Sequence, residues 1–570
     1  MDSQLTCFPY SVGHGSEGVC LLVQMGHHRI LLDCGLEFLA VLDQGAEAEP
    51  PMDVILCSHA HRDHARGLKQ LHQRFPQIPI YGSEVTSQLL PLNWLEGGTG
   101  AEGADKEARE DPNQEESFCT ALPWRSPIEI LPGLVVELFP AGHLPGAAAI
   151  SLNYTPPEPE QPLPPLSLAA LAQNLRPLSL FYTGDFFLSH TRLVEGLDLQ
   201  SVRGLQPDVL ILEGSYGTTR HPHRRQQENQ LVEQMSQVLS GGQSILLPVP
   251  TLGLGQEILM LLRSHHQFTG RRVDIWVDTR VAASCDAYLE ILPHLPSTVQ
   301  NFARHQPLFW DDRVLPRVRR LPPDFLTILE SSSLEPCILL VNHNTDWSKY
   351  CQADLDQWVV FIPHDSSQSR GIQDSSGEDF PANLRIINYL LAQHCDRQGT
   401  TQLIHNLRPQ HIIFVHGSNN YLGDLACLEE LQSRYQLHCP QAGVLVDLPL
   451  GETFAHPSVP IQPNYEGELN ELGTVVTITL PEAIAADLRW QKFADTGLIE
   501  ARWQGEELIL KGLSAREILQ QNQNPSRTLT GVLCCSNCQY DRYQRCTNPQ
   551  SPLYRFKVPP EGYCPAFVPL

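Results

Sequence analysis

The densest group of metal-liganding side chains in this sequence follows a short apolar run. Residues 54–57, Val-Ile-Leu-Cys, have the composition of a buried strand. Four potential ligands come directly after it: His59, His61, Asp63 and His64. At the end of an extended segment, residues two apart point the same way, so His59 and His61 can reach one metal ion together. If the chain then turns into a helix, Asp63 and His64 are presented to a second ion nearby.

The chemistry of these side chains favours zinc. Imidazole and carboxylate groups suit zinc, and a catalytic zinc site leaves one position open for water. Two metal ions about 3.5–4 Å apart can activate a bridging hydroxide and stabilise both the attacking and the leaving oxygen of a displacement. The alternative is a chance cluster of polar residues on a surface turn. Because the four ligands directly follow a buried strand, the sequence predicts a hydrolytic metal site instead.

The spacing His-x-His-x-Asp-His resembles the signature of the metallo-β-lactamase superfamily. Three further segments resemble the other motifs of that superfamily, in the same order along the chain: Leu32-Asp33-Cys34-Gly35, Ala141-Gly142-His143 and Tyr182-Thr183-Gly184-Asp185. The resemblance implies an α/β fold of the metallo-β-lactamase type, an αββα sandwich, with two zinc ions in its active site.

The resemblance also implies a role for each motif residue. One zinc ion would be held by His59, His61 and His143. Asp63 and His64 would hold the other ion, and Asp185 would bridge both. Asp33 would orient the histidine cluster from behind it. The di-iron branch of the superfamily usually carries a carboxylate at the position of His61, so the histidine here favours zinc over iron.

The long segment after Asp185 narrows the resemblance to one branch. Most small members of the fold soon end with a last histidine, whereas here about 200 residues intervene. The β-CASP nucleases, which include the cleavage-and-polyadenylation-type endonucleases and RNase J, insert a second α/β domain at this point. Three segments resemble their extra motifs: Leu212-Glu213-Gly214-Ser215-Tyr216-Gly217, Gln393-His394-Cys395-Asp396 and Phe414-Val415-His416-Gly417.

This branch implies three further functional residues. His416 would complete the second zinc site, and His394 would be the general acid that protonates the leaving oxygen, positioned by Glu213. Histidine suits that task because it titrates near neutral pH. The structural alternatives are a helix-end histidine that interacts with the helix dipole, for His394, and a surface carboxylate, for Glu213.

The chain departs from the β-CASP pattern at places that concern the substrate. Leu254 stands where the family often has an arginine. In place of the Gly-rich substrate-contact segments usually seen before the motif of His394, the chain has Asn342-His343-Asn344-Thr345-Asp346-Trp347 and a polar stretch at 366–378. These departures bear on substrate identity and RNA affinity, and they leave the metal chemistry intact.

Apolar periodicity outlines the elements that position these residues. Strands and helices alternate through a strand at 209–212, a helix at 227–239, a strand at 244–249, a helix at 252–263 and a strand at 273–277, which predicts a parallel sheet with covered faces. We expect the first part of the metallo-β-lactamase domain at 1–207, the inserted β-CASP domain at 208–388, the closing part of the first domain at 389–455 and a small C-terminal α+β region with a cysteine cluster at 456–570.

Composition and charge limit the location and the partners. The sequence contains no apolar run of 18 or more residues and no secretory signal at its start, so we expect a cytoplasmic protein without a membrane span. The net charge of −25 argues against polyanion binding by the surface as a whole. It still allows an RNA substrate, because bound metal cations and a local basic groove can invert the field at a site.

Five of the sixteen cysteines crowd into the C-terminal region. The spacing Cys535-x2-Cys538-x7-Cys546-x17-Cys564 can supply four thiolates, and a structural zinc ion is the first interpretation. An iron–sulfur cluster is an alternative because Pro565 follows Cys564, and unligated thiols are another.

Three functions from different classes follow. The first is a zinc-dependent ribonuclease, most simply an endonuclease, in which a metal-bridged hydroxide attacks phosphorus and His394 protonates the departing oxygen. The second is a two-zinc hydrolase of a small ester or phosphodiester. The third is a non-catalytic partner that keeps the fold for assembly, and the full ligand set argues against it. Dimers are common in related nucleases, so a homodimer is also expected.

Overall fold

The computed structural model divides the chain into two compact units, Met1–Val459 and Pro460–Leu570. The structure describes residues 5–15, 17–36, 50–96, 118–156, 176–331, 335–346, 348–351, 357–363, 384–450, 468–472, 475–479, 499–504, 507–512, 538–542, 545–549 and 568. The first unit contains three sheets.

The first sheet has seven strands. Their order is β20 (Val446–Asp447), β1 (Leu5–Val12), β2 (Val19–Met25), β3 (His28–Leu32), β4 (Val54–Leu56), β5 (Ile80–Ser83) and β6 (Cys119–Leu122). Strands β20 to β3 pair antiparallel, and β3 to β6 pair parallel.

The second sheet also has seven strands. Their order is β19 (Gln436–His438), β18 (His411–Val415), β11 (Val209–Glu213), β10 (Leu178–Tyr182), β9 (Ala148–Tyr154), β8 (Leu134–Pro140) and β7 (Ile128–Leu131). Strands β10, β11, β18 and β19 run parallel to one another. Their carboxyl ends therefore meet at one edge of the sheet.

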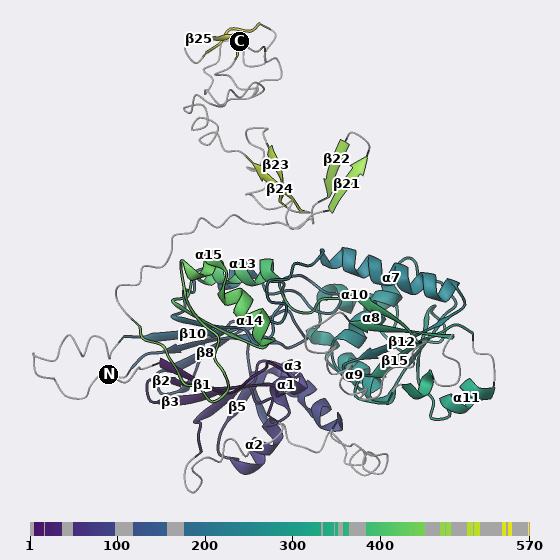
Figure 1. Cartoon of the computed structure of the whole chain (residues 1–570), viewed down its shortest axis with the longest axis horizontal. Helices are drawn as coiled ribbons and strands as arrows, with labels where there is room; N and C mark the ends of the chain where they lie inside the picture. The colour runs from purple at the N-terminus through teal and green to yellow at the C-terminus, as the bar shows by residue number, and fades with distance from the viewer. Residues whose placement is uncertain are drawn as a thin grey trace, which may run out of the picture. The chain divides into compact units, whose positions relative to one another are not determined.

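The two sheets pack face to face and are covered by helices on their outer faces, so the predicted αββα sandwich is confirmed (Figure 1). Alternation along a strand explains the layers, because Val54 and Leu56 enter the core between the sheets whereas Ile55 faces the helices. The helices of the first sheet are α1 (Arg62–Ala65), α2 (Leu68–Arg74), α3 (Glu84–Leu89) and the 3-10 helix η2 (Leu90–Glu96). Those of the second are α6 (Leu199–Val202), α13 (Arg397–Leu407), α14 (Asn419–Ala426) and α15 (Glu429–Gln432).

The third sheet is inserted between two strands that are neighbours in the second sheet, β11 and β18. Its six strands are all parallel, in the order β14 (Arg317–Arg320), β13 (Asp274–Val277), β15 (Ile338–Asn342), β12 (Ser244–Val249), β16 (Trp358–Pro363) and β17 (Arg385–Tyr389). Helices α7 (Arg224–Ser240), α8 (Leu254–Ser264), α9 (Thr279–Glu290) and α10 (Ser297–His305), with η4 (Leu292–His294), share one apolar core with it. The other face packs on α11 (Phe325–Ser331) and η5 (Ser348–Tyr350).

This arrangement is the inserted α/β domain predicted from the alternation of strands and helices. The chain leaves the sandwich only after β11, so Val209–Glu213 lies in the second sheet although it falls within the range 208–388. The limits of the four expected parts therefore remain a proposal.

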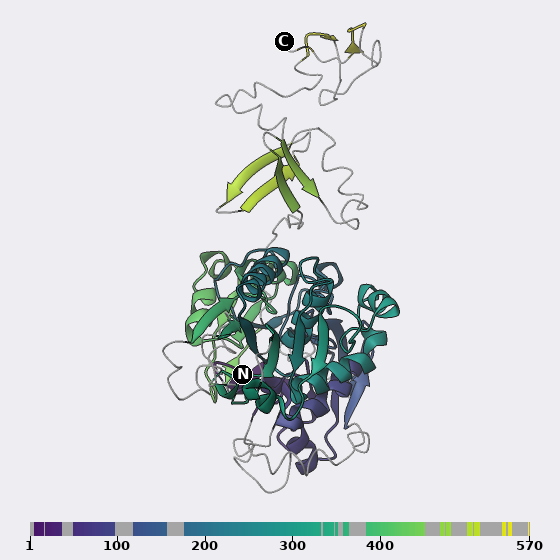
Figure 2. The ribbon, with the colours of Figure 1, turned by 90° about the vertical axis from the view of Figure 1, so that its right-hand side faces the viewer.

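The second unit contains three two-stranded hairpins among its described residues. They pair β21 (Glu468–Leu472) with β22 (Val475–Thr479), β23 (Ile499–Gln504) with β24 (Glu507–Gly512) and β25 (Asp541–Arg542) with β26 (Arg545–Cys546); the first two appear as paired arrows in Figure 2. Cys538 and Cys546 are buried, while Cys535 and Cys564 lie outside the described residues. The four-thiolate site thus stays a prediction.

None of the helices in the described ranges is long and apolar enough to cross a membrane.

Candidate metal centre

The predicted ligands meet because each of them follows a strand of the sandwich. The histidine cluster follows β4, His143 follows β8, Asp185 follows β10, and His416 follows β18. Strands β10, β11 and β18 are parallel neighbours, and Glu213 pairs with Val415 in their register. Residues separated by more than two hundred positions are therefore brought to one sheet edge by strand pairing.

The local turn after β4 follows the sequence prediction. His61 has an extended backbone (φ −69°, ψ 149°), and α1 begins at Arg62 directly after it. The amide of Cys34 donates to the carbonyl of His64 (2.8 Å), which ties the first motif to this helix. Gly35 is required there, because a Cβ on it would lie 1.8 Å from the Asp63 carbonyl oxygen.

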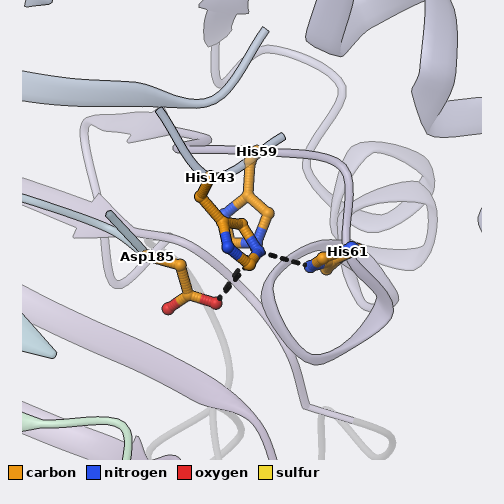
Figure 3. A group of neighbouring side chains, drawn as sticks. All are labelled: His59, His61, His143 and Asp185. Atoms are coloured by element: carbon orange, nitrogen blue, oxygen red, sulfur yellow. Dashed lines mark hydrogen bonds and ion pairs between the residues drawn. The ribbon is translucent and has the colours of Figure 1, made fainter. Parts of the chain in front are cut away.

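Three imidazoles and one carboxylate form the first group of ligand atoms (Figure 3). Their ligand atoms all lie within 4.8 Å of one another: His59, His61, His143 and Asp185. The His143 Nε2 atom is 2.9 Å from His61 Nδ1 and 3.6 Å from Asp185 Oδ2. His59 Nε2 is 3.5 Å from the same carboxylate oxygen.

The second group consists of Asp63, His64 and His416. His416 Nε2 is 3.1 Å from Asp63 Oδ2. The other carboxylate oxygen of Asp185, Oδ1, is 3.3 Å from His64 Nε2 and 3.4 Å from His416 Nδ1. The two oxygens of Asp185 thus face different ligand groups, as a bridging carboxylate requires.

Buried polar atoms without partners indicate that this cluster is built for metal ions. The Nε2 atoms of His59, His61 and His64 and the Oδ1 atom of Asp185 are buried and have no hydrogen-bond partner among the described residues. Leaving such groups unsatisfied costs about 1–3 kcal/mol each. The cost is removed when the atoms coordinate a cation, so the donor set fits metal ions.

Asp33 lies behind the cluster and fixes the orientation of one ligand. Its carboxylate accepts from the Ser58 amide (2.6 Å), the Ser58 hydroxyl (2.7 Å), the Tyr182 hydroxyl (2.6 Å) and Nδ1 of His64 (2.8 Å). The Ser58 hydroxyl also lies 3.0 Å from His59 Nδ1. With Nδ1 of His64 held as a donor, its Nε2 is left free to bind a metal ion.

The two ligand groups differ in their protonation. Burial and the neighbouring imidazoles hold the pKa of His59 and of His143 well below the ordinary value, so these rings are neutral and ready to ligate. Burial also opposes charge on His64, but Asp185 and Asp33 raise its pKa well above the ordinary value.

His394 and Glu213 form a pair that shares a third group of potential ligand atoms with Asp185 and His416. His394 Nδ1 is 2.9 Å from Glu213 Oε1 and 3.9 Å from Asp185 Oδ2, and its ring stacks against His416 with 5.8 Å between centroids. Glu213 also accepts from the Phe186 amide and from the backbone and hydroxyl of Ser215. Because these contacts keep Glu213 in place, it can hold the Nδ1–H of His394.

The structure thus brings together all ten residues predicted for the active site: Asp33, His59, His61, Asp63, His64, His143, Asp185, Glu213, His394 and His416. The sequence indicated no role for Ser58, Tyr182 or Ser215, which support them. Ser58 directly precedes His59, and Tyr182 and Ser215 lie within the motif segments of Asp185 and Glu213, which are the local signals that could have indicated them.

Two family models match this chain. The model of the beta-lactamase superfamily domain matches residues 28–223, and the model of the Zn-dependent metallo-hydrolase RNA specificity domain matches residues 380–435. The chain belongs to the β-CASP family of the metallo-β-lactamase superfamily. The two matched ranges contain every motif residue of this β-CASP chain described above.

Relatives of this β-CASP protein differ in how much of their length it covers. An uncharacterised protein of Synechocystis (sll0514) is 48% identical over 99% of this chain and 97% of its own length. A probable RNase, MJ4 of Methanocaldococcus jannaschii, is 30% identical over 43% of this chain and 54% of its own. The endoribonuclease YSH1 of Mycosarcoma maydis is 22% identical over 76% of this chain. The chain spans about half the length of these last two relatives (54% and 49%).

Proposed function

We propose that this protein is a zinc-dependent ribonuclease that cuts phosphodiester bonds inside an RNA chain. The observation that carries the proposal is the position of Asp185. Its two carboxylate oxygens face two separate groups of ligand atoms, and the pair of His394 and Glu213 lies directly beside them. A two-metal centre with an adjacent proton donor matches the needs of phosphodiester hydrolysis.

The residues that would hold the two ions form two sets that share Asp185. The first set is His59, His61, His143 and Asp185, and the second is Asp63, His64, His416 and Asp185. When bound, two zinc ions supply an activated water and neutralise charge on the phosphoryl oxygens.

The chain's own residues orient the ligands and supply the proton. Asp33 holds His64, and the carbonyl of Gln393 holds His143 through a hydrogen bond of 2.9 Å to Nδ1. Glu213 accepts from Nδ1 of His394 and keeps that imidazole from rotating. His394 then donates a proton from its other nitrogen, Nε2, to the departing oxygen, which would otherwise leave as an unstable alkoxide.

RNA is favoured as the substrate by the relatives of this chain. Two of them are named as a probable RNase and an endoribonuclease, and the matched RNA specificity domain spans His394 and His416. The relatives are longer than the matched part, so the substrate rests on this likeness together with the metal geometry.

A second candidate function is hydrolysis of a small ester or phosphodiester. The net charge of −25 favours it, because a long polyanion meets repulsion over most of such a surface. Leu254 also offers no charge to a phosphate where the family often has an arginine. If the protein hydrolyses small substrates, its cleavage rate on a phosphodiester should not change when flanking nucleotides are added. A ribonuclease should cleave the longer substrate faster.

The test is cleavage of a structured, end-labelled RNA by zinc-loaded protein, with Asp63→Ala and His394→Ala as variants. We expect cleavage by the parent, loss of zinc and activity in the first variant, and loss of activity with zinc retained in the second. Intact RNA in the presence of fully zinc-loaded parent protein would contradict the ribonuclease proposal and favour the small-substrate hydrolase.

The proposal extends to features of the whole protein. It includes zinc as the metal, two ions in the active site, a homodimer, a cytoplasmic location and a structural zinc ion, or alternatively an iron–sulfur cluster, in the C-terminal region. Metal analysis tests the C-terminal site. That site should add a further metal ion or inorganic sulfide, and this addition should remain when Asp185 is substituted.

A further inference from the structure

The segment that carries His394 is held by the first turn of a helix in the inserted domain. The Ala392 amide donates to Gln227 Oε1 (2.8 Å), and the Ala392 carbonyl accepts from Arg224 Nη1. Both side chains are buried, with 8% and 3% of their surfaces exposed for Arg224 and Gln227. Both backbone polar groups of the residue two positions before His394 are thus occupied by helix α7.

The far side of the same segment is held by the chain that leads into α7. The Arg397 amide donates to the Thr219 carbonyl (3.0 Å), and the Asp396 carboxylate accepts from the His221 amide (3.1 Å). Residues 392–397 are therefore fixed on both sides of His394 by residues 219–227. The imidazole enters the metal centre from a segment with little freedom to shift.

The segment held by these hydrogen bonds also contacts a predicted metal ligand. The carbonyl of Gln393, between the clamped Ala392 and His394, accepts from Nδ1 of His143. A displacement of this segment would move the proton donor and the orientation of His143 together. A change of about 1 Å in such a geometry costs on the order of a hundredfold in rate.

Buried charges keep Arg224 in one place. Its guanidinium lies 3.4 Å from Glu228 and 3.5 Å from Glu257, and both carboxylates are buried. Glu257 in turn accepts from the amides of Arg192 (2.9 Å) and Leu193 (2.8 Å) in the sandwich. Because an arginine fork between buried carboxylates is held in one orientation, its remaining N–H is aimed at Ala392.

We propose that Arg224 and Gln227 are positioning residues for proton donation by His394. They act through the backbone of Ala392, two residues before His394. This assignment rests on the proposed ribonuclease function, in which His394 protonates the leaving oxygen. It gives the inserted domain a part in the chemical step in addition to any contact with substrate.

A matched pair of substrates separates positioning from a merely structural role. The first is an RNA whose cleavage site has been mapped, and the second is the same RNA with sulfur in place of the leaving oxygen. A thiolate departs without protonation, so the second substrate does not need the proton from His394. A partly unfolded variant loses activity on both substrates equally, whereas a displaced proton donor slows only the oxygen substrate.

The experiment compares Gln227→Leu, Gln227→Glu, Arg224→Lys and a control, Arg225→Lys, in full-length zinc-loaded protein. Gln227→Leu removes the acceptor for the Ala392 amide, while Gln227→Glu keeps it and loses only the hydrogen bond from Nε2 to the Pro222 carbonyl (2.6 Å). Arg225 is exposed on the same turn of α7. We expect Gln227→Leu to lower kcat about tenfold or more on the oxygen substrate and less than about twofold on the sulfur substrate, with KM and zinc content unchanged.

Arg225→Lys should behave like the parent, and Arg224→Lys should follow Gln227→Leu. Gln227→Glu should lose less than Gln227→Leu on the oxygen substrate, because it keeps the acceptor for the Ala392 amide and loses only the donor to the Pro222 carbonyl. If Arg224→Lys does not fold, the two Gln227 variants decide the matter. Equal losses on both substrates, or no loss in Gln227→Leu, would overturn the assignment while the parent still cuts RNA. A parent that leaves RNA uncut contradicts the proposed function itself, and the positioning role then fails with it.

Discussion

The metal centre lies between two regions that contribute to it in different ways. The sandwich supplies the seven predicted metal ligands, from residues that follow its strands. Among the described residues from 214 to 389, which lie between β11 and the segment of His394, no side chain belongs to a candidate metal group. The inserted domain contributes backbone and support instead: Gly253 approaches His61, and α7 holds the segment of His394.

The two regions therefore have different roles. The sandwich provides the metal ligands, and the inserted domain controls how they are used. Ligands at strand ends of a packed sheet have fixed positions, because the core between the two sheets resists displacement. A domain connected through loops can instead vary the substrate while the metal centre stays the same. Four predictions, from the largest expected effect to the smallest, test this division.

The largest effect is expected at the carboxylate shared by both ligand groups. Asp185→Asn weakens the bridge between the groups, so zinc content should fall below two per chain. RNA cleavage should fall about a thousandfold, which corresponds to about 4 kcal/mol of transition-state stabilisation. Elemental analysis and end-labelled RNA measure the two outcomes on the same sample.

The control for this change is Asp208→Asn, at a buried carboxylate of the same sheet that binds Arg176 and Ser179 and not the ligands. It should keep both zinc ions and most of the activity. If Asp185→Asn retains two zinc ions and cleaves RNA almost as fast as the parent, the ligand groups of the sandwich are not the catalytic centre.

A smaller loss is expected at the residue behind the ligands. The Asp33 carboxylate accepts a hydrogen bond from Nδ1 of His64. In Asp33→Asn the side-chain amide can place its own N–H against that nitrogen, so the His64 ring is no longer held in one orientation. Zinc affinity should fall about tenfold to a hundredfold. Titration with a competing chelator checks this, and an unchanged affinity would show that Asp33 does not orient the histidine cluster.

Two glycines allow the two regions to be compared directly. In the sandwich, a Cβ on Gly35 would lie 1.8 Å from a backbone oxygen, so Gly35→Ala should lower the free energy of unfolding by about 3 kcal/mol. In the inserted domain, Gly253 has a φ of +92°, and its nearest neighbours are side-chain atoms at 3.2 Å. Gly253→Ala should cost about 1–2 kcal/mol. Urea unfolding measures both.

Gly423→Ala is the control for both changes, since nothing lies within 4 Å of that position in α14. It should leave stability unchanged or raise it by up to about 1 kcal/mol. If Gly253→Ala lowers the free energy of unfolding more than Gly35→Ala does, the inserted domain is more rigid than the sandwich at these positions, which is the opposite of what we expect.

The smallest effect is expected at a histidine pair in the sandwich that lies away from the metal centre. His411 Nδ1 is 3.0 Å from His438 Nε2, and burial together with His411 lowers the pKa of His438 to about 4. In an unfolded chain histidine titrates near 6.5, so the unfolded state binds more protons between about pH 6.5 and 4. The free energy of unfolding therefore falls as the pH drops through that range.

His438→Gln keeps a donor near His411 and removes the titrating group. The urea midpoint of the parent should drop between pH 7.5 and 5.5, and the drop should be smaller in the variant. An equal drop in both proteins would assign the pH dependence to other groups.

The sequence predicted best what depends on neighbouring residues. The strand expected at 244–249 and the helix expected at 227–239 correspond to β12 (Ser244–Val249) and α7 (Arg224–Ser240). The cluster from His59 to His64 could be interpreted alone, because strand alternation and a helix turn fix its directions. The distant motifs needed the family resemblance, since strand pairing brings Asp185 and His416 together.

Contacts between distant residues had no sequence signal. Tyr182 reaches Asp33 across 149 positions, and Arg224 reaches Ala392 across 168. Neither follows from periodicity, because each depends on how two finished elements pack. The C-terminal cysteines remain open for a different reason, since Cys535 and Cys564 lie outside the described residues.

The central claim is that one centre holds two zinc ions and cuts RNA. It is tested most directly by measuring zinc per chain and RNA cleavage on one preparation of a protein with Cys535, Cys538, Cys546 and Cys564 replaced by serine, so that the C-terminal region adds no metal. We expect two zinc ions per chain and internal cleavage that stops when a chelator removes them. Cleavage that persists without metal, or two bound zinc ions with RNA left intact, would contradict it.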